Sequence, residues 1–70
     1  MFSGKRLKEI REEKQLSQTD IAEKLHINRS SYNKWETGVS KPNQKNLVLL
    51  SQLLEVEPSY FESEHAIVVS

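Results

Sequence analysis

The sequence contains no cysteine and no apolar stretch longer than four residues, and each absence excludes a class of protein. Without cysteine, neither a disulfide framework nor a thiolate zinc site can supplement the core, so packing alone must hold the fold. Apolar runs this short provide neither a signal peptide nor a membrane span. We therefore expect a cytoplasmic protein that makes no membrane contact and lives in a reducing compartment.

Repeats, low-complexity segments and long alternating patterns are also missing, which leaves no basis for predicting a sheet. Seventy residues suffice for one small domain and exclude a second, catalytic one. Apolar residues make up 36% and charged residues 29% of the chain, a balance typical of soluble globular domains. The expected fold class is all-α.

The net charge of zero conceals an asymmetry between the two parts of the chain. Residues 1–45 hold all ten bases and six acids, a net charge of +4, whereas residues 46–70 hold four glutamates and no base, a net charge of −4. A partner responds to the local field, so the basic part can steer toward phosphate. The pattern permits nucleic-acid binding without proving it.

Cap residues and apolar spacing predict five short helices. Ser3, Ser17, Asn28 and Asn43 are good N-caps, and Ser17 forms a capping box with Asp20. The predicted helices run from Ser3 to about Lys14, from Ser17 to Leu25, from Arg29 to Thr37, from Gln44 to Leu54 and from Pro58 to Glu62. Gly38 is expected to end the third helix as a left-handed C-cap residue, and residues 64–70 are expected to be extended.

The predicted core comes from one face of each helix. Its expected members are Leu7, Ile10, Ile21, Ala22, Leu25, Tyr32, Trp35, Leu47, Leu50, Leu54, Tyr60 and Phe61. Arg11 and Lys14 share the face of Leu7 and Ile10, and a buried guanidinium at Arg11 would need a partner.

The second and third predicted helices are joined by only three residues, 26–28, which is typical of a helix-turn-helix. The stretch 16–38 reads LSQTDIAEKLHINRSSYNKWETG, and it is followed by Lys41-Pro42 and by LLSQLLEV at 49–56. This sequence resembles the lambda-repressor and Cro-type helix-turn-helix family, also called the XRE family. The resemblance covers about residues 5–62, so we expect a DNA-binding domain at 1–63 and a tail at 64–70 that serves as a linker or a dimerisation segment.

The resemblance implies that the second helix braces against the phosphate backbone while the third enters the major groove of double-stranded DNA. It makes the outer face of the third helix the base-contacting surface, formed by Arg29, Ser30, Asn33 and Lys34. Their chemistry fits independently, because Arg or Lys can reach guanine, Asn can pair with adenine, and Ser can serve several bases. The alternative is an ordinary solvated helix face.

Two further groups follow from the resemblance. The expected phosphate contacts are Gln18, Lys41, Asn43, Gln44 and Lys45. Asn43 can instead be only a cap, and Lys45 only a solubilising charge. Arg11 and Glu36 are expected to form a structural salt bridge that holds the third helix against the first. The sequence departs from the family pattern at His26, where glycine is usual, and at the aromatic residues Tyr32 and Trp35.

The predicted function is transcriptional regulation, with repression by a homodimer as the specific expectation and no cofactor or metal. An antitoxin, or another helical bundle whose main partner is a protein, is the alternative. Its contact surface would be the fourth helix and the tail. Val48, Leu49 and Leu53 could form an outer apolar strip on the fourth helix, and with Tyr60, Phe61 and residues 67–69 they could form a self-association surface. The alternative is that these side chains pack in the core. An enzyme is disfavoured because no paired carboxylate, Gly-rich phosphate loop or metal-ligand spacing accompanies the two histidines, His26 and His65. The operator, the effector and membership in a longer regulator stay open.

Overall fold

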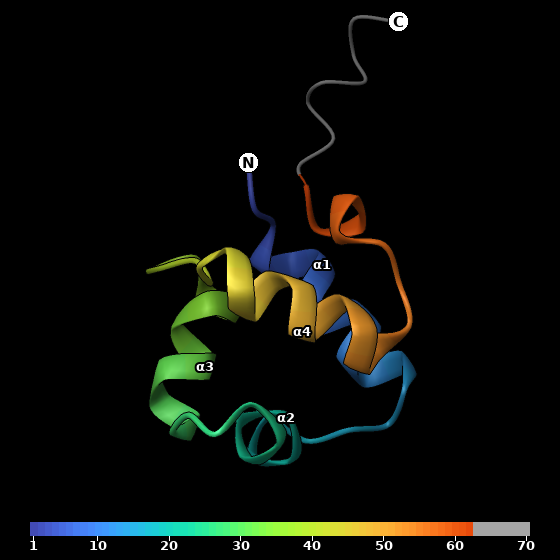
Figure 1. Cartoon of the computed structure of the whole chain (residues 1–70). Coiled ribbons are helices and arrows are strands. Elements are labelled where there is room, and N and C mark those ends of the chain that lie inside the picture. The colour runs from blue at the N-terminus through green and yellow to red at the C-terminus, as the bar shows by residue number, and fades with distance from the viewer. Residues whose placement is uncertain (63–70) are drawn as a thin grey trace, which may run out of the picture.

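A computed structural model describes residues 1–62, and the regular elements in this part of the chain are all helical. The elements are α1 (Gly4–Glu13), α2 (Gln18–Leu25), α3 (Arg29–Thr37), α4 (Gln44–Leu54) and the 3-10 helix η1 (Pro58–Phe61), as Figure 1 shows. The all-α prediction is confirmed. The prediction for the tail, 64–70, lies outside the described residues.

Each α-helix begins where the sequence predicts. The side chains of Ser3, Ser17, Asn28 and Asn43 each accept a hydrogen bond from the backbone N–H three residues later. The capping box of α2 is complete, because the Asp20 carboxylate also accepts from the Ser17 N–H, at 2.9 Å. These bonds satisfy donors that the first helical turn leaves unpaired, so the cap residues define the starts of the helices.

The prediction of five α-helices is wrong at its last member. Residues Pro58–Phe61 form a single 3-10 turn, in which the N–H of Tyr60 donates to the carbonyl of Glu57 at 2.8 Å. Proline suits the first position, but the side chain of Glu57 makes no capping bond, and the backbone is extended again at Glu62. Four residues are too few to establish the longer-range bonds of an α-helix, so the tighter turn forms.

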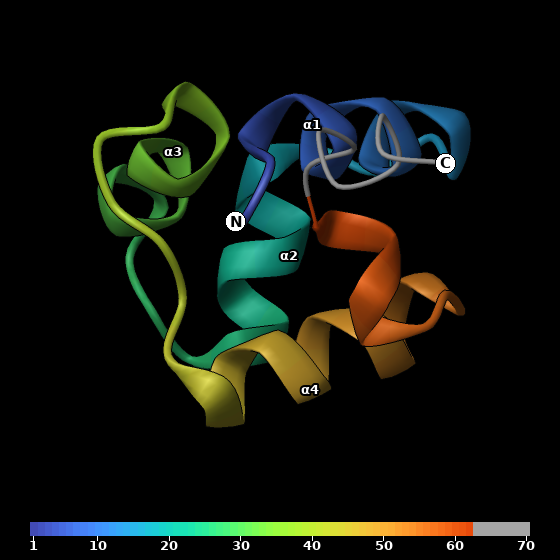
Figure 2. The same ribbon diagram turned by 90° about the horizontal axis from the view of Figure 1, so that it is seen from above.

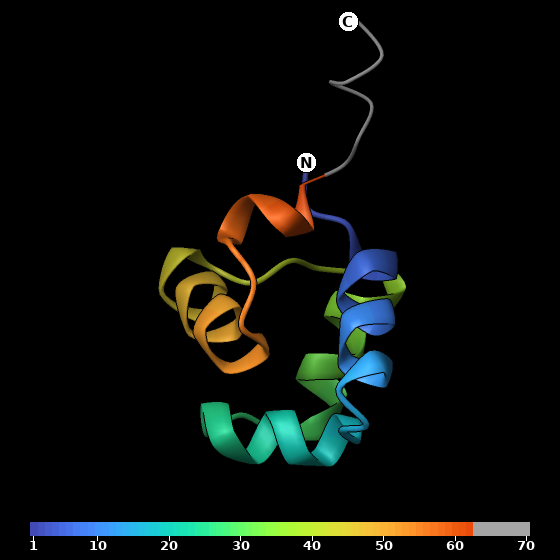
Figure 3. The same ribbon diagram turned by 90° about the vertical axis from the view of Figure 1, so that its right-hand side faces the viewer.

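The helices surround one core to which every element contributes. Figure 3 shows α1 and α4 on opposite sides, with α2 below them and η1 above, and Figure 2 shows α3 flanking α1 and α2. The buried apolar residues are Leu7, Ile10, Ile21, Ala22, Leu25, Tyr32, Trp35, Leu50, Leu54 and Phe61. Because α3 gives only its two aromatic residues to this core, its opposite face remains open to solvent.

The N-terminal segment fixes α1 against both η1 and α3. Phe2 pairs with Glu62 in an isolated antiparallel bridge, and its ring stacks on that of Phe61 with 5.7 Å between the centroids. A Cβ placed on Gly4 would lie 2.3 Å from the carbonyl oxygen of Trp35, so only glycine permits this approach. The first turn of α1 therefore sits directly against the end of α3.

Some details of the predicted packing need correction. Leu47 and Tyr60 are only half-buried, although both pack against the core, and Lys14 at the end of α1 is exposed. Phe61 is fully buried, so it belongs to the core and not to an outer contact surface. Leu49 and Leu53 are half-buried and pack against the core cluster, in agreement with the alternative that they are core residues.

Candidate nucleic-acid interface

The turn between α2 and α3 sets the angle at which α3 is presented. His26 adopts the left-handed conformation, with φ 60° and ψ 40°, at the position where the sequence predicts such a residue. The N–H of Ile27 closes the end of α2 by donating to the carbonyl of Ala22 at 3.0 Å, and the Ile27 side chain packs against the core. Ala22 is 2% exposed, and its small side chain suits a close helix crossing.

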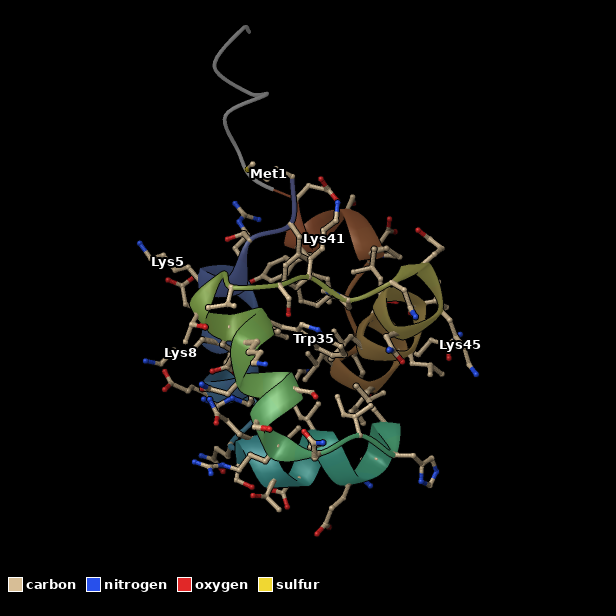
Figure 4. The ribbon with its side chains drawn as sticks, turned by 90° about the vertical axis from the view of Figure 1, so that its left-hand side faces the viewer. Met1, Lys5, Lys8, Trp35, Lys41 and Lys45 are labelled. Carbon is tan, nitrogen blue, oxygen red and sulfur yellow. The ribbon has the colours of Figure 1, made fainter. Side chains whose placement is uncertain are left out.

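The side chains of α3 divide sharply between the two faces of the helix. Tyr32 and Trp35 are buried, and their rings meet edge to face at 5.8 Å. Figure 4 shows α3 across the front of the molecule, with Trp35 turned inward between α3 and α4. The predicted base-contacting residues are all exposed on the helix: Arg29, Ser30, Asn33 and Lys34. The structure therefore brings these four together as one solvent-facing surface.

A polar cluster beneath this surface ties α3 to α1 and α2. Glu36, whose side chain is 3% exposed, accepts from Arg11 Nε at 2.6 Å and from a second guanidinium nitrogen at 3.3 Å. The third guanidinium nitrogen donates to the Leu16 carbonyl at 2.7 Å, and the Tyr32 hydroxyl donates to Glu36. The predicted Arg11–Glu36 pairing is present, and it is bidentate.

Electrostatics keep both members of this pair charged. Burial alone raises the pKa of Glu36, but hydrogen bonds from Arg11, Tyr32 and Gln18 outweigh burial and hold the pKa below its ordinary value. The bond to Glu36 raises the pKa of the Arg11 guanidinium. Burial and then the bond to Glu36 raise the pKa of the Tyr32 hydroxyl, which therefore stays protonated as a donor. Glu36 is thus an ionised carboxylate that can only accept.

Gln18 begins α2, as predicted, and its side chain also bonds to residues of α3. Its half-buried side chain lies along α3, where Nε2 donates to Glu36 Oε1 at 2.9 Å and to Asn33 Oδ1 at 3.0 Å. Residue spacing gave no sign of the bond between Gln18 and Asn33, because the two residues lie on different helices. The first backbone N–H groups of α2 have no intrahelical partner and still suit a phosphate.

Basic and polar side chains flank α3 on two sides. The predicted phosphate-contacting residues at the start of α4 and in the preceding loop are exposed: Lys41, Asn43, Gln44 and Lys45. The Oδ1 of Asn43 accepts from the Asn46 N–H at 2.8 Å, so the capping role predicted as its alternative is real. Figure 4 shows Lys41 and Lys45 beside α3, and Lys5 and Lys8 of α1 on its other side.

Lys5 and Lys8 were missed by the sequence reasoning. Both are exposed and stand three residues apart on α1, away from the buried Leu7 and Ile10. The sequence showed only that the two lysines share the polar face of α1. The fold shows that this face lies next to α3.

Other kinds of site find little support among residues 1–62. A surface hollow of about 480 Å³ is lined by Met1, Phe2 and residues 38–41, which lack a catalytic pair. Within the same residues, no group of three or more His, Cys, Asp or Glu side chains is placed to hold a metal ion. None of the helices described is long and apolar enough to cross a membrane.

Comparison with known proteins gives a consistent result. The family described as helix-turn-helix matches residues 7–61. The chain is 40% identical over 60 residues to the uncharacterized HTH-type transcriptional regulator YqaE of Bacillus subtilis (strain 168), which covers 86% of this chain and 51% of that protein. It is 35% identical over 57 residues to the HTH-type transcriptional regulator DicA of Escherichia coli (strain K12), covering 81% of this chain and 42% of that protein.

A third relative is named for a specific direction of regulation. The HTH-type transcriptional activator BcrR of Enterococcus faecalis is 35% identical over 56 residues, covering 80% of this chain and 28% of that protein. The chain thus spans about half, or less, of the length of these three relatives. The family and the relatives' names confirm the resemblance seen in the sequence, and they describe regulators rather than enzymes.

Proposed function

Since the chain belongs to the XRE-type helix-turn-helix family, we propose that it binds double-stranded DNA sequence-specifically by inserting α3 into the major groove, and thereby regulates transcription. The observation that carries this proposal is the two-faced α3. Its aromatic side is buried, while its outer side presents Arg29, Ser30, Asn33 and Lys34 to solvent. A helix of this kind fits the major groove, whose base edges offer partners to these side chains.

Phosphate contacts complete the proposed interface. The proposed contacts come from Gln18 in the first turn of α2 and from exposed residues between Lys41 and Lys45, and Figure 4 shows Lys41 and Lys45 on the side of α3 opposite Lys5 and Lys8. A helix inserted between two phosphate backbones needs contacts on both sides, because these contacts fix its register. Lys5 and Lys8 extend the basic flank along α1. We include them among the phosphate-contacting residues.

We further propose that residues 1–63 form the DNA-binding domain of a cytoplasmic repressor that acts as a homodimer, with 64–70 as its tail. A small DNA-binding domain can repress transcription by occupying a promoter, which requires no second surface for contacting another protein. In a dimer, the two copies of α3 would lie about 34 Å apart, one turn of DNA, and the operator would be nearly palindromic. Sedimentation that shows only monomers, with and without operator DNA, would contradict the dimer.

The assignment of base and phosphate contacts is tested by selecting binders from a random duplex pool at fixed salt and by measuring the affinity for a selected duplex at several salt concentrations. Arg29→Ala should cost about 1–3 kcal/mol of binding and relax the preference at one base position. Lys41→Ala should weaken all sequences evenly and lower the slope of log affinity against log salt by about 1. Uniform effects from both variants would contradict the assignment.

Lys14→Ala is the matched control for these variants. Lys14 is also an exposed lysine, but it pairs with Glu55 at 3.1 Å where α1 and α4 end, away from α3 (Figure 1). Its replacement should change neither the sequence preference nor the salt slope. A loss equal to that of Lys41→Ala would show that net charge, rather than position, governs binding.

A further inference from the structure

Gln18 connects the buried ion pair to a residue on the outer face of α3. A single nitrogen, Nε2, lies 2.9 Å from Glu36 Oε1 and 3.0 Å from Asn33 Oδ1. Glu36 is almost fully covered, whereas Asn33 is exposed. The three side chains therefore form a relay from the interior to the proposed DNA-binding surface.

The direction of every hydrogen bond in this relay follows from the charge of Glu36. An ionised carboxylate has no hydrogen to give, so the Gln18 amide must turn its NH2 group toward Glu36. The same NH2 group carries a second hydrogen, and that hydrogen points to Asn33, which must answer with its oxygen. The NH2 group of Asn33 is then left for other partners, together with the second lone pair of its oxygen.

We propose that Gln18 is a positioning residue that presents Asn33 to DNA as a hydrogen-bond donor and thereby sets a preference for guanine at one base position. This inference rests on the proposed function. Guanine offers two adjacent acceptors, N7 and O6, in the major groove, whereas adenine pairs with an asparagine that both donates and accepts. Because the bond from Gln18 occupies one of the two lone pairs of the Asn33 oxygen and holds that oxygen toward α2, the adenine pairing expected from the residue type alone is disfavoured.

Selection from a random duplex pool with the Gln18→Met variant tests this inference. Methionine keeps the length of the side chain but cannot donate to Asn33, whose amide is then able to turn. The base position concerned is the one whose preference disappears in Asn33→Ala. At that position the preference for guanine over adenine should fall by about tenfold, within the range of a single base contact. Thr19→Ala, an exposed neighbour in the same turn, should leave the preference unchanged.

Asn33→Asp provides a second variant that leaves the buried cluster in place. Its carboxylate can still accept from Gln18, but it turns an acceptor instead of a donor toward DNA. Since cytosine presents a donor at N4, the preferred base at this position should change from guanine to cytosine. This result is informative even if Gln18→Met proves poorly folded by circular dichroism.

Exchange of side-chain amide hydrogens, followed by NMR in the unbound protein, tests the relay without DNA. The Gln18 NH2 signals should exchange more slowly than those of Asn33, since only the former are both bonded within the protein. Equal loss of affinity for all sequences in Gln18→Met, or faster exchange at Gln18, would overturn the inference. A wild-type chain that selects no sequence, while the exchange pattern holds, would instead overturn the proposed function and with it the guanine preference.

Discussion

Glu36 receives hydrogen bonds from three different side chains, Arg11, Tyr32 and Gln18. It does so although it lies near the end of α3, a helix whose outer face is exposed. The carboxylate is covered because α1, α2 and α3 converge on it. Removing one partner from a buried, bonded ion pair leaves the other charge without compensation, which costs more than the pair itself contributes.

We predict that Glu36→Ala lowers the free energy of unfolding by about 3–5 kcal/mol, because the Arg11 guanidinium is then buried without a counter-charge. Urea unfolding followed by circular dichroism measures the change. Glu12→Ala is the matched control, since Glu12 is exposed and lies 3.8 Å from the same guanidinium. Its effect should stay below about 1 kcal/mol. Equal losses in both variants would contradict a special role for Glu36.

The same carboxylate predicts a loss of stability in acid. The pKa of Glu36 in the folded protein lies below its ordinary value of 4.5, so the unfolded chain takes up the proton first as the pH falls. The contribution of Glu36 is therefore complete above about pH 4.5 and disappears as the pH drops through the folded-state value. Urea unfolding of the wild type and of Glu36→Gln between about pH 6 and pH 3 should show a shallower decline in the variant. Parallel declines would contradict this origin.

Helix starts were readable from the sequence because capping is local chemistry. Ser3, Ser17, Asn28 and Asn43 each bond to an N–H only three residues away, so no knowledge of the fold was needed. Helix type at the C-terminal end was not readable, because proline favours the first turn of either helix type. The 3-10 turn η1 ends at Phe61 because the backbone is extended again at Glu62.

The turn of the helix-turn-helix gives a prediction about backbone strain. His26 holds φ at 60°, a conformation that costs L-residues about 1–2 kcal/mol and glycine very little. After allowing for the greater freedom of glycine when unfolded, His26→Gly should stabilise the domain by about 0.5–1 kcal/mol. Thermal unfolding followed by circular dichroism should show a higher Tm.

Glu23→Gly is the control for His26→Gly. Glu23 is exposed within the regular part of α2, where glycine costs about 1 kcal/mol. The two glycine substitutions, three residues apart, should therefore move Tm in opposite directions. A decrease in both would mean that the His26 side chain makes a contribution larger than the strain.

Across the chain, the sequence predicted which residues share a face more reliably than which faces meet. Helical spacing alone exposed Arg29 and Asn33 together and buried Tyr32 and Trp35, as the structure confirms. The bond between Gln18 and Asn33 required the relative position of two helices, which spacing within one helix does not contain. For the same reason, the sequence did not predict that Lys5 and Lys8 lie next to α3 or that Leu47 is only half-buried.

The arrangement of charge belongs to the molecule rather than to any single helix. All ten lysines and arginines lie within residues 5–45, and those labelled in Figure 4 flank α3 on both sides. The α4 and η1 side carries the glutamates at 55, 57 and 62. We expect this distribution to steer a polyanion toward the outer face of α3, and the steering to weaken as salt screens the charges.

NMR of the 15N-labelled protein, titrated with a selected duplex, locates the bound surface without any mutation. The backbone amide signals of residues 29–34, 41 and 43–45 should shift strongly. The signals around Lys14 and Glu55, at the C-terminal ends of α1 and α4, should hardly move. Strong shifts concentrated on α4 and η1, with residues 29–34 unchanged, would contradict the placement of α3 in the major groove.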